Sequence, residues 1–170
     1  MNSQYTLNYR VMYYDTDAGG VVHNLAYLRW VEEARTKMAI ELGMDYGAMA
    51  KEGRHLVLVS HEVHYHSPAF LADEVHVNTC LEKVEKSSMF VRTEIRRAEN
   101  DKLCVSVLQR LALVQMPQGR PCRMPAEWVA LAAPQEKSGT QNFSHPQGHP
   151  CGFFLFLHNL PATGRDILTA

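Results

Sequence analysis

The chain has 170 residues, of which 46% are hydrophobic, and it carries 17 Lys and Arg against 18 Asp and Glu. This length suits one domain and this composition can fill a core, which excludes fibrous, collagen-like and wholly disordered proteins. A formal net charge of -1 provides no basic field for a phosphate backbone, so we do not expect nucleic acid as a partner.

The sequence also allows a prediction of the cellular compartment. The first ten residues are polar, without an apolar run after a basic start, so no secretory signal is expected. The most apolar short stretch, residues 153–157, is far below the ~20 residues of a membrane-spanning helix. The four cysteines form no C-x-x-C pair, which fits neither a zinc ribbon nor a disulfide framework. We therefore predict a cytoplasmic protein with reduced thiols and no transmembrane segment.

The N-terminal part predicts a strand followed by a long helix. Residues 5–14 are rich in aromatic and β-branched residues and predict a strand, which the turn-forming DTDAGG of residues 15–20 ends. In residues 25–42 apolar side chains recur at helical spacing: Tyr27, Val31, Ala34, Met38 and Leu42. Asn24 stands at the N-cap position and Gly43 just after the C-cap, so both helix ends have a stop signal.

A series of strands follows the helix. The region around Gly47 and Gly53 predicts turns. Period-two patterns predict four strands, at residues 56–65, 74–85, 88–97 and 102–116. Turn residues separate the last three strands at hairpin-like lengths, so these three should form an antiparallel meander. The segment 125–133 starts with Pro and predicts a short closing helix.

This order of elements indicates an α+β domain over residues 1–133, in which an antiparallel sheet curls around one long helix. Such a sheet has open edges that proteins pair or cover, so we expect a dimer with a shared sheet. Residues 134–170 change to Ser, Gly, Pro, Gln, Asn and His and predict a low-complexity, flexible C-terminal tail. Its apolar pentapeptide, residues 153–157, leaves three interpretations open: docking on the core, contact with a partner, or a sequence accident such as a shifted reading frame.

The segment YYDTDAGGVVHNLAYLRWVEEAR, residues 13–35, resembles the signature of the hotdog-fold acyl-CoA thioesterases. The nearest branches are the 4-hydroxybenzoyl-CoA thioesterase type and the thioesterases encoded with the Tol-Pal system. HLVLVSHEVHYHSPAFLADEVHV and SSMFVRTEIRR follow in the order of that family's later strands. The resemblance implies the hotdog fold, an acyl-CoA substrate of unspecified acyl group, no cofactor, and a homodimer or a homotetramer of two dimers.

Thioester hydrolysis needs a carboxylate or water to attack the carbonyl and donors to stabilise the oxyanion. The thiol, with a pKa near ~8.5, leaves with little assistance. Asp17, a glycine turn and a helix start supply both requirements, because free amides and the positive end of the helix dipole favour negative charge. By resemblance, Asp17 is the catalytic carboxylate, acting either as nucleophile or as general base on water.

The resemblance also implies substrate-binding positions. Gly19 and Gly20 match the glycines of the family's loop. The amides near Asn24 and Leu25 match the helix start that polarises the thioester carbonyl. Tyr13 matches a tyrosine that lines the site in the Tol-Pal-associated branch, although an ordinary strand aromatic explains it equally well.

The sequence departs from the family pattern at one position. That branch often has His where this chain has Asn24, and His23 directly precedes it. The role of the histidine is therefore either absent or taken by His23. Asn24 can cap the helix and orient the carbonyl, but it cannot transfer a proton at neutral pH. We predict Asp15 as a turn residue that closes the first strand.

No metal site is expected, because strand alternation places His64 and His66 on one face and His61 on the other. Two alternatives to hydrolysis stay open. A hotdog hydratase or dehydratase would need a histidine paired with a carboxylate for proton abstraction. A non-catalytic acyl-CoA binding module would keep the fold without turnover.

Overall fold

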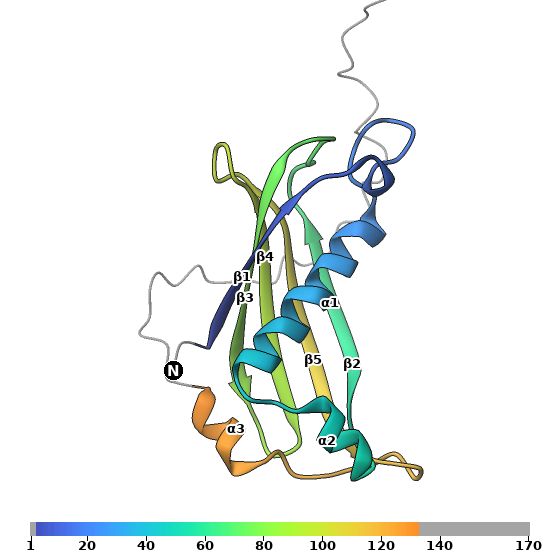
Figure 1. Ribbon diagram of the computed structural model, residues 1–170, viewed down its shortest axis with the longest axis vertical. Coiled ribbons are helices and arrows are strands. Elements are labelled where there is room, and N and C mark those ends of the chain that lie inside the picture. The colour runs from blue at the N-terminus through green and yellow to red at the C-terminus, as the bar shows by residue number, and fades with distance from the viewer. Residues whose placement is uncertain (1–2, 133–170) are drawn as a thin grey trace, which may run out of the picture. The chain divides into compact units, whose positions relative to one another are not determined.

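The computed structural model describes residues 3–132. The predicted tail of residues 134–170, which includes Cys151, lies outside the described residues. The chain order is shown in Figure 1 and runs β1 (Gln4–Arg10), a 3-10 helix (Tyr13–Asp15), α1 (Asn24–Glu41), α2 (Tyr46–Lys51), β2 (Arg54–Tyr65), β3 (Glu74–Val84), β4 (Ser88–Arg97), β5 (Leu103–Gln115), β6 (Arg120–Pro121) and α3 (Ala126–Leu131). Within this described part, no helix is long and apolar enough to cross a membrane.

The strands form one antiparallel sheet in the order β1-β3-β4-β5-β2, with β6 paired to β5. The predicted meander of three strands is confirmed as β3, β4 and β5. Strands β1 and β2 are brought to the ends of this order by pairings distant in sequence, β1 with β3 and β2 with β5. The site-bearing segment between β1 and α1 therefore starts from one end of the sheet.

Helix α1 lies across one face of the sheet, over β1, β3 and β4 (Figure 1). The predicted apolar stripe faces the sheet: Tyr27, Val31, Ala34 and Met38 are buried and Leu42 is half-buried. Trp30, which the predicted stripe omitted, is fully buried and packs on Tyr9 with ring centroids 4.7 Å apart. Each large apolar side chain buried in this way stabilises the fold by about 1.5–3 kcal/mol. The expected architecture of a sheet packed around one long helix is confirmed.

Two local predictions are wrong. The first strand ends at Arg10, because the Met12 N–H donates to Asp15 Oδ2 (2.9 Å) and the Asp15 N–H donates to the Met12 carbonyl (3.0 Å). These bonds coil residues 13–15 into the 3-10 helix. The six-residue helix α2 occupies the region predicted as turns, and the Asp45 carboxylate caps it by accepting from the Ala48 N–H (2.9 Å).

Helix α1 ends where the sequence predicted. Leu42 is the C-cap, and Gly43 follows it with φ +78°, a left-handed conformation that glycine adopts at low cost. The closing helix predicted at residues 125–133 is present as α3, with Pro125 at its N-cap.

Candidate active site

Asp17 lies in a tight turn that joins the 3-10 helix to α1. Thr16 and Val22 form an antiparallel bridge at the base of this turn. The Asp17 N–H donates to the Val21 carbonyl and the Gly20 N–H donates to the Asp17 carbonyl, both at 2.9 Å. Gly20 has φ +71°, which only glycine adopts without strain. The turn therefore holds the backbone of Asp17 at a fixed position before the helix.

The Asp17 carboxylate is exposed and has one oxygen committed to the turn. Its Oδ1 accepts from the Gly19 N–H at 2.8 Å and, more weakly, from the Val21 N–H at 3.4 Å. Within residues 3–132, Oδ2 has no hydrogen-bond partner. A carboxylate held by one oxygen and free at the other can attack a carbonyl carbon or accept a proton from water.

The N-cap of α1 is His23, which corrects the prediction of Asn24. The backbone of His23 is extended (φ -75°, ψ 153°), and its Nδ1 accepts from the Ala26 N–H at 3.1 Å. Nε2 lies 3.4 Å from the Tyr14 carbonyl. This pair of contacts requires the neutral tautomer with its hydrogen on Nε2. Asn24 is instead the first helical residue, so its side chain does not cap.

Two free donors lie at the start of this helix. Asn24 and Leu25 are exposed, and neither N–H has a partner among the described residues. The first amides of any helix lack partners within it, and here the dipoles of an 18-residue helix add partial positive charge at the same end. The start of α1, seven residues after Asp17 in the chain, can therefore stabilise a developing oxyanion.

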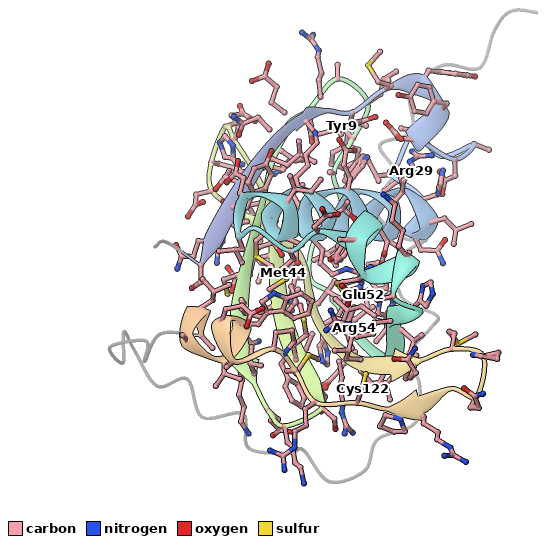
Figure 2. All side chains as sticks on the ribbon, turned by 60° about the horizontal axis from the view of Figure 1, so that its bottom comes forward. Tyr9, Arg29, Met44, Glu52, Arg54 and Cys122 are labelled. Carbon is pink, nitrogen blue, oxygen red and sulfur yellow. The ribbon has the colours of Figure 1, made fainter. Side chains whose placement is uncertain are left out.

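The structure contradicts the simple turn assignment of Asp15. Its side chain is fully buried, and it accepts from the Met12 N–H (2.9 Å), the Tyr9 hydroxyl (3.2 Å) and the Arg29 guanidinium. Figure 2 shows Tyr9 and Arg29 at the same end of α1. Sequence reasoning missed Arg29 as a residue of this site, because nothing in its spacing marks a partner 14 residues earlier.

Tyr13 is not a strand residue. It begins the 3-10 helix, and its side chain is 82% exposed. Its hydroxyl has no hydrogen-bond partner within the described residues. A role for Tyr13 in lining the site stays a prediction.

A polar cluster that the sequence did not indicate lies between α1 and the inner face of β2 and β5. The Gln109 amide is buried and donates to Glu32 (2.8 Å) and to His61 Nε2 (2.5 Å). Arg35 forms a bidentate ion pair with the same Glu32. His61 therefore faces the helix, whereas His64 of β2 and His66, which directly follows that strand, lie on the opposite side with ring centroids 6.4 Å apart. This confirms the predicted split of the histidines.

A cavity of about 170 Å³ lies near the other end of α1, between α2, β2 and β5. It is lined by Arg35, Tyr46, Met49, Arg54, His55, Leu56 and Leu111. Arg35 is eleven residues beyond Asn24, which is about 17 Å along the helix axis, so this cavity is separate from the Asp17 turn. In the described part of the chain no group of three or more His, Cys, Asp or Glu could hold a metal ion.

Comparisons with known proteins identify the family of this chain. Residues 11–132 match the family model described as the thioesterase-like superfamily. The acyl-CoA thioester hydrolase YbgC of Escherichia coli is 35% identical over 94 residues, which are 55% of this chain and 70% of that protein. A protein of Aquifex aeolicus that is named only as an esterase is 41% identical over 71 residues, 41% of this chain. The chain spans 56% of that protein's length.

Solved structures show the same fold. A 1,4-dihydroxy-2-naphthoyl-CoA thioesterase from Synechocystis superposes with a TM-score of 0.70 at 22% identity, covering 76% of this chain and 95% of its own. The family match covers more than half of the chain, and the sheet and helix are those of the solved relative. The chain belongs to the thioesterase-like superfamily and has its hotdog fold.

Proposed function

We propose that this protein hydrolyses an acyl-CoA thioester to the free acid and coenzyme A, with Asp17 as the catalytic carboxylate. One observation carries the proposal: among the described residues, a carboxylate with one unpartnered oxygen stands in a hydrogen-bonded turn that leads into a long helix, and the first amides of this helix also have no partner there. The family match and the thioester hydrolase name of the YbgC relative support the same reaction.

In this mechanism the thioester carbonyl oxygen lies at the start of α1, near the N–H groups of Asn24 and Leu25. Asp17 attacks the carbonyl carbon or removes a proton from a water that attacks it. The negative charge that develops on the carbonyl oxygen is stabilised by the two amides and by the helix dipole. The carbon–sulfur bond then breaks, and coenzyme A leaves as a thiolate, a good leaving group because of its low pKa. If Asp17 is the nucleophile, this leaves an acyl–Asp17 anhydride, which water hydrolyses to the free acid and the free Asp17 carboxylate. If Asp17 is the general base, the attack of water gives the free acid directly, and Asp17 returns its proton to the thiolate.

We also propose that the working form is a homodimer whose subunits meet along β2, with the acyl pocket formed between helix and sheet across that interface. β2 lies at one end of the strand order, and three consecutive apolar residues are exposed on it: Val57, Leu58 and Val59. Exposed apolar sheet edges are usually paired in native proteins. A tetramer of two such dimers is the corresponding larger assembly.

The test is thiol release from short aliphatic, long aliphatic and aromatic acyl-CoAs, followed with a thiol-reactive dye. Wild type is compared with Asp17→Asn and with the matched control Asp45→Asn. Asp45 is a suitable control because it is another exposed carboxylate next to a helix start, and its Oδ1 likewise accepts a backbone N–H. A protein-only blank is needed, although burial raises the pKa of the Cys80 and Cys104 thiols and slows their reaction.

We expect turnover in wild type and Asp45→Asn, and a fall in kcat of at least 100-fold in Asp17→Asn with an unchanged unfolding midpoint. Near wild-type turnover in Asp17→Asn would remove Asp17 from the mechanism. Hydration of an enoyl-CoA without thiol release would favour a hydratase. Ligand-induced stabilisation without turnover on any acyl-CoA would favour a binding module.

A further inference from the structure

We propose that Asp15 is a positioning residue, which with Arg29 fixes the turn of Asp17 against the start of α1. This inference rests on the proposed function, because it assigns Asp15 a role that acts through Asp17. It gives a function to the first aspartate of the DTD sequence that turn propensity does not explain.

The burial of Asp15 is the first observation. Its side chain is fully buried, whereas Asp17, two residues later, is exposed. Removing a carboxylate from water costs several kcal/mol unless donors and an opposite charge compensate it. A residue that only closed a turn would keep its carboxylate in solvent. The buried position therefore indicates that the chain uses this carboxylate to hold other groups.

Its partners come from three separate segments. Oδ2 accepts from the Met12 N–H at 2.9 Å and from the Tyr9 hydroxyl of β1 at 3.2 Å, and Oδ1 pairs with Arg29 of α1. Burial raises the pKa of Tyr9, with further contributions from its hydrogen bond to Tyr14 and from Asp15, so this hydroxyl keeps its proton as donor. One carboxylate thus joins the end of β1, the 3-10 helix and the second turn of α1.

Two further contacts tie the same segment to the helix start. The His23 N–H donates to the Asp15 carbonyl at 3.0 Å. The Arg29 guanidinium also lies over the Tyr14 ring, 5.6 Å from its centroid. Asp15 is therefore held to α1 in three ways: by its carboxylate on Arg29, by its carbonyl at the N-cap His23, and through the contact of Tyr14 with Arg29.

These contacts link the two halves of the proposed site. The carboxylate of Asp17 belongs to the turn, while the amides of Asn24 and Leu25 belong to the helix. Catalysis of this kind is sensitive to the relative position of attacking group and oxyanion donors, and a displacement of about 1 Å can cost about 100-fold in rate. Asp15 is inaccessible to substrate, so its effect on the rate passes through the position of Asp17.

The experiment compares kcat and KM for wild type, Asp15→Asn and Arg29→Lys, with Glu33→Gln as control. Glu33 forms an exposed ion pair with Lys37 on the same helix at 2.7 Å, so its loss tests a helix ion pair remote from the turn. We expect kcat to fall at least tenfold in Asp15→Asn with KM within about threefold of wild type. Arg29→Lys keeps the positive charge, so its kcat should lie between those of wild type and Asp15→Asn. Glu33→Gln should match wild type.

A double-mutant cycle separates positioning from general loss of stability. If Asp15 acts through Asp17, adding Asp15→Asn to Asp17→Asn should lower the residual rate little further. Where Asp15→Asn does not fold, Tyr9→Phe removes a single donor to the same carboxylate and takes its place. Wild-type kcat in the folded Asp15 or Tyr9 variant, or fully additive losses in the cycle, would overturn the positioning role. Retained activity in Asp17→Asn would instead overturn the proposed function.

Discussion

At the scale of single residues, Tyr27 shows how one side chain connects the core to the site. Tyr27 belongs to α1, and its buried ring packs against Trp30 of the same helix with centroids 5.4 Å apart. Its hydroxyl accepts from the Ala69 N–H at 3.0 Å. Ala69 in turn accepts from the Val22 N–H at 2.9 Å, at the base of the Asp17 turn. Burial raises the pKa of Tyr27 from 10.0 to about 12.

This shift predicts a dependence of stability on pH. The unfolded chain loses the Tyr27 proton near pH 10, before the folded chain does, so the contribution is fully present below pH 10 and is lost as the pH rises toward 12. At pH 11 the loss should be about 1 kcal/mol. Urea unfolding at pH 8 and pH 11 gives the free energy of unfolding at each pH. The decrease between the two pH values should be smaller for Tyr27→Phe than for wild type.

Tyr13→Phe is the control, because the Tyr13 side chain is exposed. This variant should show the same decrease in the free energy of unfolding between pH 8 and pH 11 as wild type. An equal difference in wild type and Tyr27→Phe would contradict this explanation. The expected baseline cost of Tyr27→Phe at pH 8 is about 1 kcal/mol, because the Ala69 N–H loses its acceptor.

At the scale of secondary structure, the position of His23 at the start of α1 determines the role of its side chain. Its Nδ1 is committed to the Ala26 N–H, which leaves that nitrogen unable to accept a proton without losing the cap. We therefore expect His23 to act as a cap. His23→Ala should lower the free energy of unfolding by about 1 kcal/mol, and His23→Asn should restore most of it.

Activity provides the second measurement for these variants. His23→Asn should keep a kcat within about threefold of wild type across pH 6 to 9, since an asparagine caps a helix but does not titrate there. A loss of about 100-fold or more in His23→Asn, with stability retained, would instead assign His23 a role in proton transfer.

The elements also show what could be predicted from the sequence. The strands near residues 74–85, 88–97 and 102–116 followed from period-two patterns and turn residues, which are local signals. Helix α2 was missed because six residues are too few for a helical period. The burial of Asp15 could not be predicted, because Tyr9 and Arg29 reach it only after the strand and helix have packed together.

For the whole molecule, the two edges of the sheet differ in character. The edge strand β1 alternates exposed and half-buried positions, and its exposed side chains are polar or charged, as in Gln4, Thr6 and Asn8. On β2, Val57, Leu58 and Val59 are 38%, 45% and 53% exposed, and Val59 lies at a register shift in the pairing with β5. Polar edges resist association and apolar edges favour it, so β2 is the edge expected to pair with a second copy.

This difference gives the last prediction. Val59→Lys places a charge on the proposed interface without touching the Asp17 turn, and Gln4→Lys places the same charge on the β1 edge. Light scattering at micromolar concentration should show a dimer or tetramer for wild type and Gln4→Lys, and a monomer for Val59→Lys. Thiol release should fall in step with the dimer, because an acyl pocket shared between subunits is incomplete in a monomer. A monomeric wild type, or a dimeric Val59→Lys, would contradict pairing along β2. A folded monomer with full activity would show that the site needs no second subunit.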